Sequence, residues 1–294
     1  MPSTLHSAPT TALRPLAPGL IQPGPLPGTA IALLQPTPDT AVALHPEEER
    51  LLDALPTGQR PDFVAGRLAA ARALAALGTE GPVLRAGRRP LFPTGVRGSI
   101  SHCTGHIGVC IASTNPAVVA TGIDLERTDR LSRGAARLVC TPREREWIAR
   151  ARRPESRLSV LFSAKEAIYK ALSGLSPRDP VFHDVELRVS HGELSVGLLT
   201  GLLPDRHRLT GWVQLLSGGY VLTSVAVLTE ALSDALPEAL PETLAPAVTE
   251  AATRGATRTV TEQAKDAARG SGSFAALIET EEFIPTRPTS FDVA

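Results

Sequence analysis

Residues 118–126, VVATGIDLE, and residues 155–172, ESRLSVLFSAKEAIYKAL, decide the fold of the chain. In the first stretch apolar side chains alternate with others, and a period of two residues is typical of a β-strand. In the second stretch Leu158, Leu161 and Ile168 recur at helical spacing. The two stretches therefore predict a strand followed by a long helix, which is the pattern of an α+β protein.

The same arrangement of helices and strands is predicted on both sides of residues 115–120. Upstream, the patterns predict a strand over 29–34, helices over 46–55 and 61–77, and strands over 98–103 and 106–113. Downstream, a helix is predicted from 142, after a capping box at Thr141 and Glu144, and strands are predicted over 184–190, 193–199, 211–216 and 220–229. Helices followed by antiparallel strands thus occur twice, which indicates two similar α+β halves.

Composition divides the chain into four segments. Residues 1–28 are rich in Pro, Thr and Ala and are expected to be a flexible leader. Residues 29–118 and 119–230 form the two expected halves. Residues 231–294 carry ten acidic and five basic side chains and are expected to be a disordered or weakly helical tail.

Charge and hydropathy exclude several classes of protein. The 294 residues contain 30 Lys and Arg against 30 Asp and Glu, so the surface as a whole does not attract nucleic acid. No stretch is long and apolar enough to span a membrane, and no signal peptide is recognised. Three cysteines without C-x-x-C spacing indicate neither a disulfide framework nor a zinc site. The cytoplasm is the expected location.

Two acids on the predicted strand are candidates for cation binding. Asp124 and Glu126 are two residues apart and therefore share one face. Gly122 lies on the same face and is expected to leave room for a cation or a phosphate. A small set of carboxylate oxygens suits Mg²⁺, which completes its shell with water and substrate phosphates. The alternative is an edge strand with solvated acids.

The predicted helix carries a second group of charges. Glu166 and Lys170 are four residues apart on one face, and Lys165 lies on a neighbouring flank. One interpretation is a surface ion pair of little energetic value. The other is a site for a cation or phosphate, because these are the only two lysines upstream of the tail and they lie in an otherwise apolar stretch.

Basic side chains in the first half are candidates for phosphate binding. His102 follows Ser101 at the end of a predicted strand, and five arginines form two clusters upstream of it: Arg60, Arg67, Arg88, Arg89 and Arg97. Guanidinium groups match the geometry of phosphate oxygens. Structural or solvated roles are the alternative for each of these residues.

Taken together, residues 122–126 (GIDLE) and 162–170 (FSAKEAIYK) resemble the two signature motifs of the 4′-phosphopantetheinyl transferase superfamily. Residues 63–67, the Arg88-Arg89-Pro90 turn and residues 98–103 are similar to its enterobactin-synthase branch. The resemblance covers residues 45–230. Phe162 stands where many members have tryptophan, which is a change at a packing position.

The resemblance implies a pseudo-dimer of two α+β halves with the active site between them. It implies Mg²⁺-dependent transfer of 4′-phosphopantetheine from coenzyme A to a serine of an acyl or peptidyl carrier protein, with release of 3′,5′-ADP. Mn²⁺ is the alternative ion, and a monomer is expected. No nucleic acid or membrane partner is expected. The pathway, whether polyketide, nonribosomal-peptide or siderophore biosynthesis, stays open.

The resemblance also implies roles for single residues. Asp124, Glu126 and Glu166 would hold the metal, and Asp124, Glu166 and Lys170 would form the catalytic set. Either Glu166 or a metal-bound water would remove the serine proton. The implied coenzyme A ligands are Arg60, Arg67, Arg88, Arg89, Ser101, His102, Lys165 and Lys170.

Two other functions use the same residues. A metal-dependent hydrolase of coenzyme A or another nucleotide would need no carrier protein. A non-catalytic protein that binds coenzyme A or a carrier would retain the fold without turnover.

Overall fold

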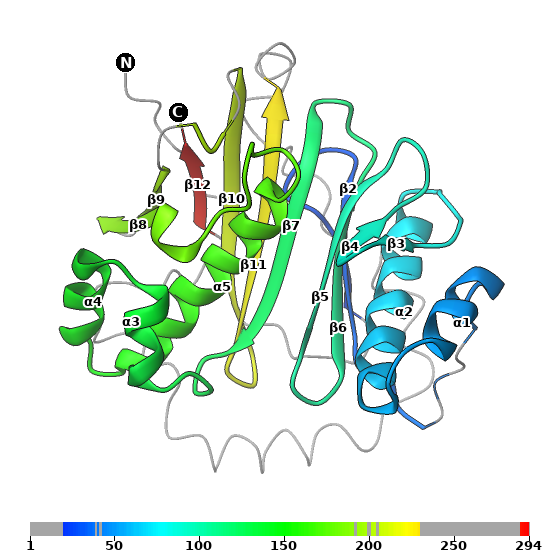
Figure 1. Cartoon of the computed structure of the whole chain (residues 1–294), viewed down its shortest axis with the longest axis horizontal. Helices are drawn as coiled ribbons and strands as arrows, with labels where there is room; N and C mark the ends of the chain where they lie inside the picture. Colours follow the sequence, from blue (N-terminus) through cyan, green and yellow to red (C-terminus); the bar gives the residue numbers. More distant parts are fainter. Residues whose placement is uncertain are drawn as a thin grey trace, which may run out of the picture.

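The computed structural model describes residues 20–38, 40, 43–190, 193–198, 201–203, 206–229 and 289–293. It contains two four-stranded antiparallel sheets, each of which packs against a long helix (Figure 1). This confirms the expected class, a mixed fold of helices and antiparallel sheets. None of the described helices is long and apolar enough to cross a membrane.

The first sheet has the strand order β1-β2-β6-β5. Its strands are β1 (Leu20–Pro23), β2 (Thr29–Leu34), β6 (Ile107–Ser113) and β5 (Arg97–Cys103). Helix α2 (Arg60–Ala76) covers one face and is preceded by α1 (Pro46–Asp53). Strand β1 corrects the expected leader over part of its length, because residues 20–23 pair antiparallel with β2. Residues 1–19 lie outside the described residues.

The second sheet has the strand order β12-β10-β11-β7. Its strands are β7 (Val118–Arg127), β10 (His207–Leu216), β11 (Tyr220–Thr229) and β12 (Thr289–Val293), and α5 (Pro154–Leu172) covers it. Strand β12 corrects the expected tail, because residues 289–293 pair antiparallel with β10. The rest of the tail, residues 230–288 and 294, lies outside the described residues.

Smaller elements complete the two halves. Strands β3 (Leu84–Ala86) and β4 (Arg89–Leu91) form one hairpin, and β8 (Val185–Ser190) and β9 (Glu193–Leu198) form another. Short helices α3 (Ala136–Val139) and α4 (Pro142–Ala149) precede α5. The predicted capping box is confirmed: the amide of Glu144 donates to Thr141 Oγ1, and the amide of Thr141 donates to Glu144 Oε2.

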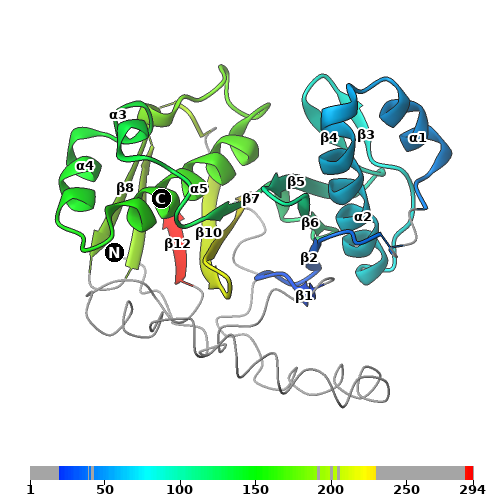
Figure 2. The same cartoon turned by 90° about the horizontal axis from the view of Figure 1, so that it is seen from below.

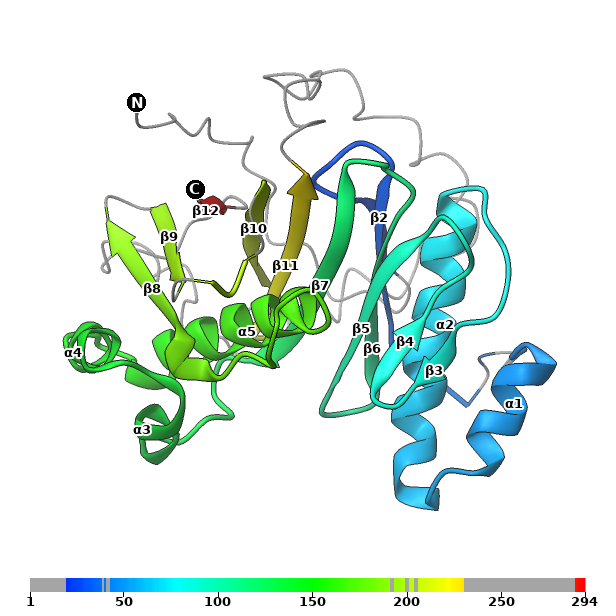
Figure 3. The same cartoon turned by 45° about the horizontal axis from the view of Figure 1, so that its top comes forward.

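The two sheets meet along their edge strands β5 and β7, which lie side by side between the two long helices (Figures 2 and 3). Apolar side chains from both sheets form one buried cluster, to which β6 contributes Val109 and Ile111 and β7 contributes Ile123 and Leu125. The opposite face of β7 packs against α5. Strand β7 is therefore covered on both sides and is not a solvated edge.

The space expected beside Gly122 is not available to a ligand. A Cβ atom on Gly122 would clash with the backbone carbonyl of Ala167 in α5. The glycine therefore lets the helix backbone approach the strand closely. The backbone of α5 therefore occupies the space that the sequence analysis expected for a ligand beside Gly122.

Candidate active site

Strands β5 and β7 belong to different sheets, and serine side chains of β5 form hydrogen bonds to β7. Ser99 Oγ accepts a hydrogen bond from the amide of Ile123 at 3.2 Å. Ser101 Oγ donates to Asp124 Oδ1 at 2.9 Å. Because alternate residues of a strand point to the same side, both serines face β7. A residue of the first half, Ser101, thus holds the side chain of Asp124, which belongs to the second half.

Lys170 closes a triangle with Ser101 and Asp124. Its ammonium donates to Ser101 Oγ at 2.8 Å, to Asp124 Oδ1 at 2.8 Å and to the carbonyl of Ile123 at 3.0 Å. The Lys170 side chain is 25% exposed, whereas that of Asp124 is 5% exposed. These three contacts use all three N–H donors of the ammonium and fix its position near solvent.

Asp124 has one oxygen without a partner. Its Oδ2 atom is buried, and no described residue donates a hydrogen bond to it. A buried carboxylate oxygen without a donor is costly unless a ligand or water satisfies it. This orphaned oxygen fits a hard divalent cation, which binds carboxylate oxygens and leaves other positions to water and phosphate.

Two further carboxylates flank Asp124. Burial raises the pKa of Glu126 above its usual range, and the charge of Asp124 adds to this effect. Arg130 opposes it through Nη1, which lies 3.4 Å from both Glu126 oxygens. Burial likewise raises the pKa of Glu166, and Lys170 opposes the shift. A cation would favour the charged form of both groups, so the donor set is chemically suited to one.

These acids do not form a complete cage. Among the described residues, no three His, Cys, Asp or Glu side chains converge closely enough to hold an ion by themselves. A cation bound here would therefore need oxygen ligands from water or substrate, as Mg²⁺ commonly does.

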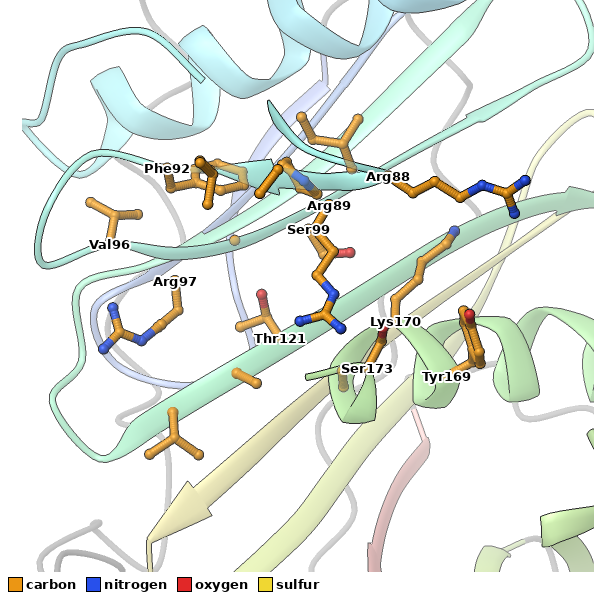
Figure 4. A pocket seen from close by; sticks show the side chains of 18 of the residues that line it. Arg88, Arg89, Phe92, Val96, Arg97, Ser99, Thr121, Tyr169, Lys170 and Ser173 are labelled. Carbon is orange, nitrogen blue, oxygen red and sulfur yellow. The ribbon is translucent and has the colours of Figure 1, made fainter. Parts of the chain in front are cut away.

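A cleft of about 790 Å³ opens beside Lys170, between the first sheet and α5 (Figure 4). Its basic lining residues are Arg88, Arg89 and Arg97 from the first half and Lys170 from the second. Asp179 is the one acid among the lining residues. The cleft is therefore electropositive and large enough for a nucleotide-sized anion.

The structure does not bring every predicted ligand to this cleft. Lys165 is fully buried, and its ammonium donates to Glu144 Oε2 at 2.7 Å and to two backbone carbonyls. This corrects the expectation that Lys165 contacts coenzyme A, because no part of its side chain is exposed. Its position on α5 points it toward α3 and α4, away from Lys170.

Four upstream candidates also lie outside the cleft lining, namely Arg60, Arg67, Ser101 and His102, and so do the metal candidates Asp124, Glu126 and Glu166. Ser101 contacts Asp124 and Lys170 instead. Arg60 donates to the carbonyls of Leu55 and Asp53, at the end of α1. Arg67 is 6% exposed and donates to the Leu84 carbonyl. The ring of His102 is exposed, and its Nδ1 lies 3.5 Å from an oxygen of Asp62. Strand alternation explains His102, which points to the opposite side from Ser101.

Sequence reasoning missed three features of the site. Tyr169 and Ser173 line the cleft from α5 and the residue that follows it. Thr121 of β7 lines the cleft as well.

Comparisons with known proteins match both halves. The model of the 4′-phosphopantetheinyl transferase N-terminal domain matches residues 47–112, and the model of the 4′-phosphopantetheinyl transferase superfamily matches residues 120–223. The chain is 36% identical over 207 residues to 4′-phosphopantetheinyl transferase Svp of Streptomyces mobaraensis, covering 66% of this chain and 83% of that protein.

Other relatives give similar values. The chain is 32% identical over 197 residues to 4′-phosphopantetheinyl transferase Npt of Nocardia iowensis, covering 62% of this chain and 88% of the relative. It is 31% identical over 196 residues to enterobactin synthase component D of Salmonella typhi, covering 63% and 79%. A crystal structure of a holo-(acyl-carrier-protein) synthase from Bacillus anthracis in complex with CoA (3′,5′-ADP) aligns at 20% identity and a TM-score of 0.32, covering 38% of this chain and 97% of that one.

Proposed function

The chain belongs to the 4′-phosphopantetheinyl transferase superfamily, and from that premise we propose that it moves 4′-phosphopantetheine from coenzyme A to a carrier-protein serine. The acceptor would be an apo acyl or peptidyl carrier protein, and 3′,5′-ADP would leave. Membership makes the chain an enzyme of the 4′-phosphopantetheinyl transferase class. The metal and the acceptor are part of the proposal.

The observation that carries the proposal is the triangle of Ser101, Asp124 and Lys170, in which Lys170 also lines the electropositive cleft. Transfer requires the coenzyme A pyrophosphate to lie beside fixed positive charge while its bond to the nucleotide breaks. Lys170 would stabilise the charge that develops on the phosphate oxygens. Arg88 and Arg89 would bind the phosphates from the other side of the cleft.

The serine oxygen of the carrier attacks the phosphorus that bears the pantetheine arm, and a phosphodiester bond forms there. The bond from that phosphorus to the oxygen of 3′,5′-ADP breaks. The serine proton would pass either to Glu166 or to a water at the site.

Asp124, Glu126 and Glu166 would hold a divalent cation, with Mg²⁺ expected and Mn²⁺ as the alternative. Such an ion would neutralise charge on the pyrophosphate when bound. The proposal draws support from the unpartnered Asp124 Oδ2 atom and from the raised pKa values of Glu126 and Glu166, which both interact with the charge of Asp124.

We further propose that residues 29–118 and 119–230 are the two halves of a pseudo-dimer with the active site between them. The match to the first family model ends at residue 112, and the match to the second begins at residue 120, so the two matches lie on either side of this boundary. Ser101 comes from the first half, whereas Asp124 and Lys170 come from the second. A site of this kind needs both halves.

The test incubates the protein with coenzyme A, Mg²⁺ and a panel of apo carrier proteins, and then measures the intact mass of each carrier. One EDTA-sensitive phosphopantetheine adduct on a carrier is the expected product. Asp124→Asn should abolish the adduct. Asp129→Asn is the matched control, because Asp129 is an exposed acid near the end of the same strand, paired with Arg127.

If coenzyme A is cleaved while every carrier stays in the apo form, the protein is a hydrolase and the proposed transfer is refuted. If Asp124→Asn transfers phosphopantetheine at the wild-type rate, the assignment of Asp124 to the active site is wrong.

A further inference from the structure

The hairpin β3–β4 carries two of the cleft arginines but has little structure of its own. Arg88 lies in its turn and Arg89 at the start of β4. Each strand is three residues long, and the pair forms a sheet separate from the two main sheets. Isolated two-stranded hairpins are marginally stable, so this one needs an anchor elsewhere.

Glu48 provides that anchor from α1. Its side chain is 8% exposed, and Oε1 accepts a hydrogen bond from the amide of Val83 at 2.8 Å. Val83 directly precedes β3 and is 1% exposed. The second oxygen, Oε2, accepts from the amide of His45 at 3.2 Å and caps the helix. One buried carboxylate therefore joins the start of α1 to the base of the hairpin.

Arg67 holds the same base from α2. Its Nε atom lies 3.8 Å from Glu48 Oε1, and Nη2 donates to the Leu84 carbonyl at 3.5 Å. The guanidinium carbon is 4.3 Å from the centre of the Phe63 ring. Burial lowers the pKa of Arg67, and the charge of Glu48 opposes the shift. Arg67 therefore depends on Glu48 for its charge balance in the core.

We infer that Glu48 is a positioning residue for substrate binding. Through the amide of Val83 and through Arg67 it fixes the base of β3, and this determines where the turn presents Arg88 and Arg89 to the cleft. The inference rests on the proposed function, in which these arginines bind coenzyme A phosphates. Glu48 itself touches neither substrate nor reacting atoms.

The first test compares Glu48→Gln with Glu49→Gln. Both variants remove one acid from the first turn of α1, but Glu49 is exposed and makes none of the contacts above. Glu48→Gln should raise the dissociation constant for coenzyme A about tenfold, measured by calorimetry, and leave kcat at saturating coenzyme A within about twofold. Glu49→Gln should change neither value.

A double-mutant cycle separates positioning from a merely structural role. If Glu48 acts through the hairpin arginines, Glu48→Gln should have little further effect on affinity in an Arg88→Gln, Arg89→Gln background. An equal loss of affinity in both backgrounds would overturn the inference. If Glu48→Gln does not fold, Glu48→Leu with Arg67→Met, which leaves no unpaired charge in the core, takes its place in the cycle.

Hydrogen exchange gives a readout that needs no substrate. Amides of residues 83–91 should exchange faster in Glu48→Gln than in the wild type, and Glu49→Gln should match the wild type. Unchanged exchange in Glu48→Gln would refute the anchoring, whatever happens to affinity. Wild-type protein that binds no coenzyme A would instead remove the proposed function, and the exchange data would still decide the anchoring.

Discussion

Replacing Lys165 by methionine should affect stability far more than chemistry. The Lys165 ammonium donates to Glu144 Oε2 at 2.7 Å, to the Val139 carbonyl at 2.9 Å and to the Phe182 carbonyl at 3.0 Å. The side chains of Lys165 and Glu144 are both fully buried. Methionine would fill much of the same volume but would leave Glu144 charged in the core and two carbonyls without donors.

The size of the effect follows from these contacts. Removing one partner of a buried ion pair costs about 3 to 5 kcal/mol of unfolding free energy. Each kcal/mol lowers the thermal midpoint by about 2 to 4 °C in domains of roughly 150 to 250 residues. The midpoint of Lys165→Met should therefore fall by about 6 to 20 °C. A second change, Glu144→Gln, should recover part of this loss because it removes the unpaired charge and keeps an oxygen acceptor for the amides that Glu144 binds, those of Thr141 and Leu187.

The assay is thermal unfolding followed by single-turnover transfer at a temperature well below the lowered midpoint. Lys165→Met should retain transfer within a few-fold of the wild type under these conditions. Lys170→Met is the matched control: it should lose transfer by orders of magnitude. A Lys165→Met variant with an unchanged midpoint and a hundredfold loss of transfer would falsify the structural role of Lys165.

Two further changes probe packing and electrostatics elsewhere. Gly122→Ala should lower the thermal midpoint sharply, because the added Cβ would clash with the Ala167 carbonyl. Gly58→Ala is the control and should not lower the midpoint, because its Cβ would meet no atom within 4 Å. Equal midpoints for the two variants would contradict the close approach of α5 to β7. Arg178→Ala should return the pKa of Asp184 toward its ordinary value, since the hydrogen bond from Arg178 is the main cause that lowers it. A depressed carboxyl pKa contributes stability that is lost as the pH falls through it, so the variant should lose less stability on acidification. Carboxyl ¹³C titration by NMR measures this shift, and an unaltered Asp184 titration would count against it.

Local patterns in the sequence predict most elements of the fold. The strand over residues 29–34 and the box at Thr141 and Glu144 follow from alternation and capping, which act over a few residues. Strands β1 and β12 were missed for the opposite reason. Their segments carry no clear period, and pairing with β2 and β10 defines them. Tertiary context decides such elements.

The candidate site divides in the same way. Glu166 and Lys170 are four residues apart, so helix geometry alone places them on one face. Lys165 and Lys170 are five residues apart, about 140° around the helix, so both cannot face one cleft. The sequence alone does not show whether Lys165 or Lys170 points toward the first half of the chain. Packing decides this, and it directs Lys165 to Glu144 and Lys170 to Asp124.

In both sheets a glycine allows the long helix to pack closely against a strand, although the sequences of the two halves show no obvious repeat. A Cβ on Gly108 of β6 would clash with the Ala65 carbonyl in α2, just as one on Gly122 of β7 would clash with the Ala167 carbonyl in α5. In each sheet a glycine admits helix backbone where a side chain would hold it away. In the second sheet this close contact places α5 against β7. The same approach that removes the expected ligand space beside Gly122 therefore brings Lys170 within hydrogen-bond distance of Asp124.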